Sequence, residues 1–150
     1  DFPSVQEAST YFAKMYLSRP NLLARRGIFV SDKKSGGLVG ACIAWFDEQN
    51  GALVSSLHWL ITKEAYHGRG IGSALIAAAL SIYEKENDFP VYLHTQPWSY
   101  QAVWLYHKFG FRLMKRESFA GYENQYALAV PVLARYIEPE CMRELMDQSE

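Results

Sequence analysis

The sequence has 150 residues, enough for one domain with a single hydrophobic core. Its net charge of −1 and its 21% of charged residues give no general attraction for nucleic-acid phosphates or anionic membranes, so we expect neither as a partner. No apolar run reaches the roughly 20 residues that a membrane helix needs and no signal peptide is visible, so we expect a cytoplasmic protein.

The first part of the sequence predicts one helix and then three strands. Apolar residues from Val5 to Tyr16 recur at three- and four-residue spacing after Ser4, a suitable cap, and this pattern predicts a helix that ends before Pro20. Glycine-containing turns typical of hairpins then join three expected strands, which are Gly27–Ser31, Leu38–Phe46 and Leu53–Ile61.

The second part alternates helices with strands. Helices are expected from Ile71 to about Lys85, at Ser99–Phe109 and at about 139–148, where Pro139 suits a first helical turn. The expected strands are Val91–Thr95, Phe111–Glu117 and Asn124–Val130, the last two around the loop Ser118–Glu123. This order predicts an α/β fold with a mixed, mostly antiparallel central sheet and helices on both faces.

The turn from Gly68 to Gly72 joins a strand to a helix and is a candidate anion site. The first N–H groups of a helix lack partners within the helix, the helix dipole adds positive charge there, and glycines let phosphates approach the main chain. Arg69 can add a charged contact. Two familiar phosphate motifs do not fit, because the turn lacks both the Lys-Ser/Thr of a Walker loop and the Gly-x-Gly-x-x-Gly spacing of a dinucleotide site.

Two segments resemble the GNAT superfamily of acyl-CoA-dependent N-acetyltransferases. His67-Gly68-Arg69-Gly70-Ile71-Gly72 is similar to the family motif Arg/Gln-x-x-Gly-x-Gly/Ala, with His67 in place of Arg or Gln. Ser99–Phe111 is similar to Asn-x-x-Ala-x-x-x-Tyr-x-x-x-Gly-Phe, with Ser99 in place of Asn and with Tyr106 at the tyrosine. The resemblance covers roughly 27–130.

The resemblance implies a single GNAT domain over 1–150, with acetyl-CoA as cosubstrate and a sheet splayed between the fourth and fifth family strands. The first family strand is missing or trimmed, because too few residues precede the first helix. Main-chain groups on the third expected strand would pair with pantetheine, one N–H near Thr62 would stabilise the thioester oxyanion, and the glycine turn would bind the pyrophosphate. The implied cofactor-binding residues are Leu60, Ile61, Thr62, His67, Gly68, Arg69, Gly70, Ile71, Gly72, Ser73, Ser99 and Tyr106.

Two side chains are candidates for catalysis. The resemblance makes Tyr106 the general acid, because a phenol of pKa about 10 can protonate a leaving thiolate of pKa about 8.5; its alternative role is core packing. His58 is the candidate base for the amine, on a strand face expected to carry Val54, Ser56 and Leu60 as well, and its alternative role is structural. Weaker candidates, as the base or as an anchor for the amine, are Glu64, Glu117 and Glu123.

The expected reaction transfers an acetyl group to a primary amine of a small molecule or peptide by direct attack. For the oligomeric state, a homodimer is left as an alternative. Cys42 and Cys141 are expected to be reduced thiols, and no residue cluster indicates a metal site. The alternatives are a catalytically degenerate GNAT domain that binds acyl-CoA as a sensor or interaction module, and a nucleotide-binding protein of another kind. Six aromatic residues on segments that can line the cleft for the amine hint at an apolar or aromatic substrate: Trp45, Trp59, Trp98, Tyr100, Phe119 and Tyr122.

Overall fold

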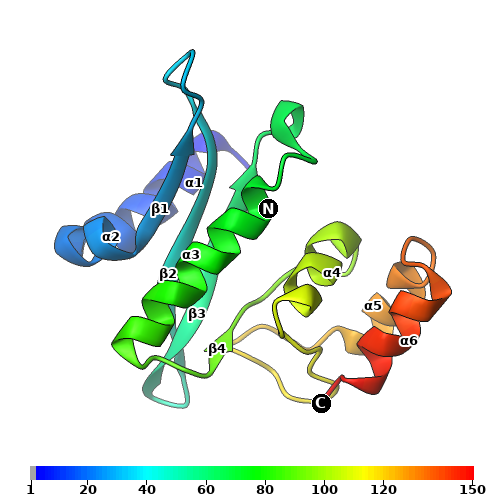
Figure 1. Cartoon of the computed structure of the whole chain (residues 1–150). Coiled ribbons are helices and arrows are strands. Elements are labelled where there is room, and N and C mark those ends of the chain that lie inside the picture. The colour runs from blue at the N-terminus through cyan, green and yellow to red at the C-terminus, as the bar shows by residue number, and fades with distance from the viewer. Residues whose placement is uncertain (1–2) are drawn as a thin grey trace.

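The computed structural model describes residues 3–150, and a mixed four-stranded sheet in the order β1-β2-β3-β4 lies at its centre (Figure 1). Strands β1 (Gly27–Ser31), β2 (Leu38–Gln49) and β3 (Ala52–Thr62) pair antiparallel in chain order. Strand β4 (Val91–Tyr92) lies parallel to β3 and is shorter than expected. The three expected N-terminal strands and the open α/β sheet are therefore confirmed.

One face of the sheet is covered by the N-terminal helices. Helix α1 (Val5–Phe12) continues into a π-helical segment (Ala13–Leu17), as the apolar spacing predicted. A further helix, α2 (Pro20–Arg26), begins where the sequence interpretation placed only an end, because proline suits the first turn of a new helix. Buried residues on this side are Tyr16, Ile43 and Trp45.

The other face is covered by α3 (Ile71–Glu86), which follows a short 3₁₀ turn at Glu64–Tyr66 (Figure 1). Apolar side chains of the sheet and of α3 form the central core there, and Cys42, as expected, is fully buried within it. The buried members are Cys42, Ala44, Leu57, Leu75, Ile76, Ala79 and Tyr83.

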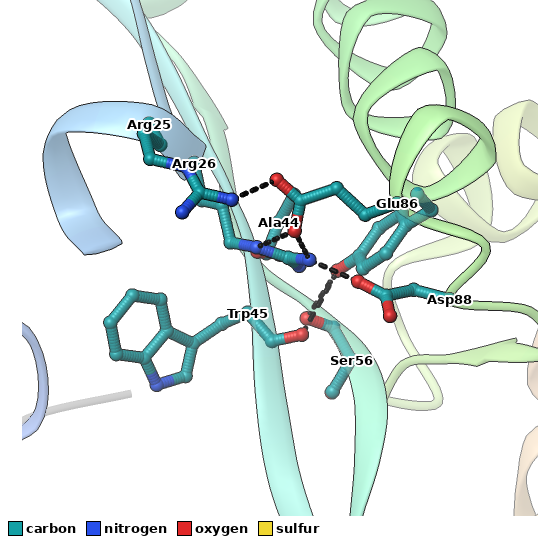
Figure 2. A network of polar contacts seen from close by, with 8 residues as sticks. Arg25, Arg26, Ala44, Trp45, Ser56, Glu86 and Asp88 are labelled. Carbon is teal, nitrogen blue, oxygen red and sulfur yellow. Dashed lines mark hydrogen bonds and ion pairs between the residues drawn. The ribbon is translucent and has the colours of Figure 1, made fainter. Parts of the chain in front are cut away.

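A buried guanidinium fastens α2 to the end of α3 (Figure 2). Arg26, with 1% of its side chain exposed, donates hydrogen bonds to the carboxylates of Glu86 and Asp88, and its Nη1 donates to the carbonyl of Ala44 at 3.0 Å. It also lies 4.2 Å from the ring centroid of Phe46. The ends of two helices on opposite faces of the sheet are thus held together by one side chain.

The C-terminal part forms a second, smaller core with α4 (Tyr100–Lys108). Figure 1 shows the helices of this part beside α4. Helices α5 (Tyr126–Leu133) and α6 (Pro139–Asp147) pack there, and α6 confirms the expected C-terminal helix. The buried residues of this core are Val103, Leu133, Ile137, Met142 and Leu145. No helix within residues 3–150 is long and apolar enough to cross a membrane.

The two strands expected after α4 are wrong. Residues 111–117 form no strand, and their main chain instead bonds Glu150, whose N–H donates to the carbonyl of Leu113 at 2.8 Å. The segment expected as Asn124–Val130 is mostly helical, because α5 packs its apolar side against α4 and α6. Asn124 lies one residue before the N-cap Gln125 and accepts a hydrogen bond from the N–H of Tyr126 at 2.8 Å.

Candidate active site

Strands β3 and β4 separate soon after they meet. They pair only at Ser55 with Val91 and at Ser56 with Tyr92, where β4 ends. Within the described chain, Leu60–Thr62 of β3 therefore continue with no strand beside them on the β4 side. This opening offers main-chain groups to an extended ligand.

A β-bulge at Trp59 shapes the same end of β3. Ile43 of β2 pairs with His58 and Ala41 pairs with Ile61, so two residues of β3 oppose one residue of β2. Trp59 has a φ of 54°, in the left-handed region. His58 and Trp59 consequently both contact the α1 side, whereas Leu60 packs towards α3. The expectation that His58 and Leu60 share one face is therefore wrong.

The glycine turn forms an open cradle at the start of α3. Gly68 and Gly70 have φ values of 73° and 76°, and no atom lies within 4 Å of the position that a Cβ would take at either residue. Gly70 caps the helix without a side-chain hydrogen bond, and its carbonyl accepts the first helical bond from Ala74 at 3.0 Å. The N–H groups of residues 71–73 thus lack partners within the helix and fit a pyrophosphate.

Two side chains of the turn make contacts that its sequence did not predict. The Nε2 atom of His67 lies 3.0 Å from the carbonyl oxygen of Thr62, which accepts its hydrogen bond and ties the turn to the end of β3. The guanidinium of Arg69 lies 4.7 Å from the ring centroid of Tyr66, and Arg69 stays exposed beside the cradle. Arg69 is thus placed to add positive charge next to a bound phosphate.

His58 is held at both of its ring nitrogens. The hydroxyl of Tyr16 lies 2.7 Å from Nδ1, and Oδ2 of Asp47 lies 2.9 Å from Nε2. Burial raises the pKa of Tyr16, so its phenol stays protonated and donates to Nδ1. Burial alone would raise the pKa of Asp47 as well, but hydrogen bonds from His58 and Ser56 outweigh it and lower that pKa, so Nε2–H donates to a carboxylate.

Asp47 is a functional candidate that sequence reasoning missed. It lies on β2 opposite Val54, four residues along β3 from His58, and its side chain reaches His58 along the strands. Of the three linked groups it is the most accessible, with 15% of its side chain exposed against 10% for His58, and Tyr16 is fully buried. The sequence showed only an acidic residue directly after a predicted hairpin strand. That residue can be connected with His58 only once the pairing of β2 with β3 is known.

Tyr106 lies on α4 among side chains of the central core. Its ring packs edge-to-face on Phe111, with centroids 5.8 Å apart, and burial raises its pKa. No hydrogen bond to its hydroxyl is found among the described residues. Tyr106 therefore packs and also keeps a protonated hydroxyl to donate. Ser99 lies at the start of the same helix, where its Oγ donates to Oε1 of Gln96 at 3.3 Å.

A tight turn crosses the front of β4 and carries two of the predicted aromatic residues. Phe119 and Tyr122 pair across Ala120 and Gly121, and the side-chain oxygen of Gln49 on β2 accepts the N–H of Ala120 at 2.6 Å. The turn confirms the loop expected at 118–123. The ring of Phe119 stacks on Tyr92 at 5.0 Å, and the ring of Tyr122 stacks on His94 at 3.9 Å.

The other predicted site residues fall in different places. Trp59 stacks on Tyr11 of α1 at 6.3 Å, beside His58. Trp45 is buried under α1, and Trp98 is 62% exposed. Tyr100 stacks on Tyr136 in the C-terminal core. The three weaker base candidates, Glu64, Glu117 and Glu123, are all exposed, and Glu64 lies before the glycine turn.

An open strand edge that leads into an anion cradle is the arrangement of an acyl-CoA-dependent acyltransferase. The model of the acetyltransferase (GNAT) family matches residues 2–111, more than half of the 150-residue sequence. The chain therefore belongs to the GNAT acetyltransferase family. The match ends where the structure departs from the expected strands.

Solved structures share the fold of this chain. The crystal structure of the NatC complex bound to Gag peptide and CoA aligns at 25% identity and a TM-score of 0.60, over 77% of this chain and 71% of that one. A putative acetyltransferase from Agrobacterium tumefaciens aligns at 21% identity and a TM-score of 0.55, over 80% and 81% of the two chains. Glucosamine-6-phosphate N-acetyltransferase from Arabidopsis thaliana aligns at 12% identity and a TM-score of 0.54, over 82% and 81%. No curated protein matches the sequence.

Proposed function

We propose that this chain transfers an acetyl group from acetyl-CoA to a primary amine of a small molecule or peptide by direct attack. The observation that carries the proposal is the continuity of the bulged end of β3 with the glycine turn, beside the linked groups Asp47 and His58. A ligand that lies along β3 with its phosphates at the start of α3 has its other end, the acyl group, near the bulge. CoA bound to the NatC complex is consistent with this ligand class.

The main chain accounts for cofactor binding in this proposal. Acetyl-CoA supplies an activated acyl thioester. Leu60–Thr62 hold the pantetheine arm along the open edge of β3, and the N–H groups of residues 71–73 hold the pyrophosphate. His67 stabilises the turn rather than the ligand, since its Nε2 donates to Thr62. An arginine or glutamine is therefore unnecessary at this position.

Asp47 and His58 serve the amine substrate. An alkylammonium of pKa about 10.4 must lose a proton before it can attack, and a carboxylate concentrates the cation while a histidine can take up the proton. Asp47 is the more accessible group and remains ionised, so we assign it the attraction of the ammonium. We assign His58 the proton, which it would accept at Nδ1 once the Tyr16 hydroxyl turns away, while its Nε2–H stays donated to Asp47.

Tyr106 supplies the proton for the departing thiolate. Its raised pKa keeps the hydroxyl protonated at neutral pH, and that hydroxyl is not committed to another described group. Packing against Phe111 holds the ring in one orientation. The role in packing and the role in catalysis are thus compatible.

The deciding experiment is a panel of primary amines and N-terminal peptides incubated with acetyl-CoA, with free thiol as the readout. We expect thiol release that depends on the amine, together with acetyl-CoA binding by calorimetry. Binding of acetyl-CoA without thiol release across the whole panel would instead identify an acyl-CoA-binding module. Absence of acetyl-CoA binding would overturn the cofactor assignment.

A further inference from the structure

Both ring nitrogens of His58 are occupied in this structure. Its Nε2–H donates to the carboxylate of Asp47 at 2.9 Å, and its Nδ1 accepts from the hydroxyl of Tyr16 at 2.7 Å. A neutral imidazole has one N–H and one bare nitrogen, so these two bonds use its whole hydrogen-bonding capacity. His58 therefore has no place for a further proton until one of the two bonds breaks.

The direction of the Tyr16 hydroxyl is fixed from its other side. Burial raises the pKa of Tyr16, so the phenol keeps its proton. The side chain of Trp59 donates a hydrogen bond to the same phenol oxygen, which directs the phenol proton to His58. The fully buried ring also meets Trp45 and Trp59 edge-on, with centroids 5.1 Å and 6.3 Å away. The bulge of β3 thus supplies both the histidine and the group that orients its partner.

The two bonds of His58 respond differently to protonation. A proton added to the ring leaves the bond from Nε2–H to Asp47 in place, and the positive charge strengthens that bond. The same proton must enter at Nδ1, where it displaces the Tyr16 hydroxyl, because two donors cannot share this contact. The bond from Tyr16 therefore belongs to the neutral base alone and must break whenever His58 takes up a proton.

Three further titratable side chains act on these groups. The ring of Tyr11 on α1 lies 6.4 Å from that of Tyr16, and Tyr122 of the turn acts on both tyrosines. His94 acts on Asp47, and burial lowers the pKa of His94, so it is neutral at pH 7. A change confined to the hydroxyl of Tyr16 leaves these groups where they are, so the effect of that hydroxyl can be measured by itself.

The element that carries Tyr16 has little else to anchor it. Within the described chain no residue of α1 is buried, and Tyr16 is the buried residue of the π-helical segment 13–17 that continues it. The next residue, Leu17, is 54% exposed. Segments with few buried contacts open more easily than the core, and π-helical turns are frequent at functional sites. A shift of this turn would take Tyr16 off Nδ1 while β2 and β3 keep Asp47 and His58 together.

We propose that Tyr16 covers the base of the substrate-free protein, and that His58 accepts the proton of the amine only after the π-helical turn moves the Tyr16 hydroxyl off Nδ1. The inference rests on the proposed acetyl transfer and adds how its base is controlled. The ammonium loses its proton to Nδ1, the neutral amine attacks the thioester, and the imidazolium stays paired with Asp47. That proton must leave His58 before Tyr16 can return, so Tyr16 is a positioning residue.

Nitrogen NMR of the histidine side chains tests the hydrogen bond without any substrate. In the wild-type protein we expect neutral His58 to carry its proton on Nε2, with its signal assigned by its loss in His58→Gln. Tyr16→Phe keeps the ring and removes the bond that only the neutral base makes, so the midpoint of the His58 titration should rise by about 0.4–1 pH unit. Neutral wild-type His58 with its proton on Nδ1, or an equal midpoint in Tyr16→Phe, would overturn the proposal.

Tyr83→Phe is the matched control for this variant. Tyr83 is also fully buried, and its hydroxyl donates to the carbonyl of Ser56 at 2.7 Å on the α3 side of the sheet. The control loses a buried hydroxyl without touching His58, so its melting temperature should fall to a similar degree while the midpoint stays at the wild-type value. Equal shifts of the midpoint in Tyr83→Phe and Tyr16→Phe would reflect a general loss of packing and would overturn the proposal.

Single-turnover rates of thiol release test the cover during the reaction. At pH values above the midpoint, Tyr16→Phe should release thiol about two- to tenfold faster than the wild type, because its base has no bond to break first. The acidic side of its pH–rate profile should move to higher pH by the same amount as the midpoint. Slower release in a folded Tyr16→Phe variant would make Tyr16 an assistant of the base and overturn its role as a cover.

The two readouts separate this inference from the proposed function. A shifted midpoint without thiol release from any protein would refute the acetyl transfer and leave Tyr16 in control of the protonation of His58. Thiol release with identical pH–rate profiles in the wild type and Tyr16→Phe would keep the acetyl transfer and overturn the control by Tyr16.

Discussion

Replacement of Arg26 tests how the fold is held together. The Arg26→Met variant keeps a long apolar side chain but removes the charge between Glu86 and Asp88 and the donor to Ala44. Removal of one partner from a buried ion pair lowers the free energy of unfolding by about 3–5 kcal/mol. We expect the lower end, about 3 kcal/mol, because 29% and 24% of the two carboxylate side chains are exposed and can take up water.

The measurement is the free energy of unfolding in urea, supported by the melting temperature. For a domain of this size a loss of about 3 kcal/mol lowers the melting temperature by about 6–12 °C. The matched control is Arg25→Met, since Arg25 is 64% exposed and pairs with the same Glu86, so its loss should cost no more than about 1 kcal/mol. Equal losses in the two variants would refute the view that burial gives Arg26 its importance.

Four further outcomes follow from the structure. Hydrogen bonds from Arg25 and Arg26 lower the pKa of Glu86, so ionised Glu86 stabilises the fold above about pH 4.5 and this stabilisation is lost as pH falls through the lowered pKa. In acid unfolding curves, Arg26→Met should therefore lose less stability on acidification than the wild type does. Gly70→Glu should abolish CoA binding by calorimetry, whereas Gly36→Glu, also at positive φ in open space, should bind normally. Tyr106→Phe should lower turnover by about 100-fold with acetyl-CoA affinity kept, and unchanged single-turnover rates would return Tyr106 to packing alone. His58→Ala should lower turnover mainly at neutral pH and recover at high pH, where the free amine is abundant. If the fall in rate on the acidic side of the pH–rate profile is unchanged in a stable variant, the base lies elsewhere.

The local features of the site could be predicted because their causes lie within a few residues. Gly68 and Gly70 adopt the left-handed conformations that glycine favours, and α3 begins directly after them. The N–H groups that make an anion site are a property of any helix start. The spacing of glycines and apolar residues was therefore enough to predict the positions of the cradle and of its helix.

The second half of the fold could be predicted only in part. Residues 126–133 combine alanines with valines and a proline, a composition that indicates helix and strand about equally. Packing of Leu133 against Met142 and Leu145 decides for the helix. The sequence around Phe111 likewise resembles a strand, but its main-chain partner is the end of the chain, at Glu150. Contacts between distant segments override local preference in both cases.

The sequence by itself determined the family, the cradle for phosphates and the position of Tyr106, since each depends on spacing along one element. Only the tertiary structure decided which groups surround His58. The bulge at Trp59 turns His58 and Leu60 to opposite faces, and the register of β2 and β3 brings Asp47 to His58 across eleven positions of sequence. A one-residue change in register would reverse these faces, and register is set by packing on both sides of the sheet rather than by any residue within the strand.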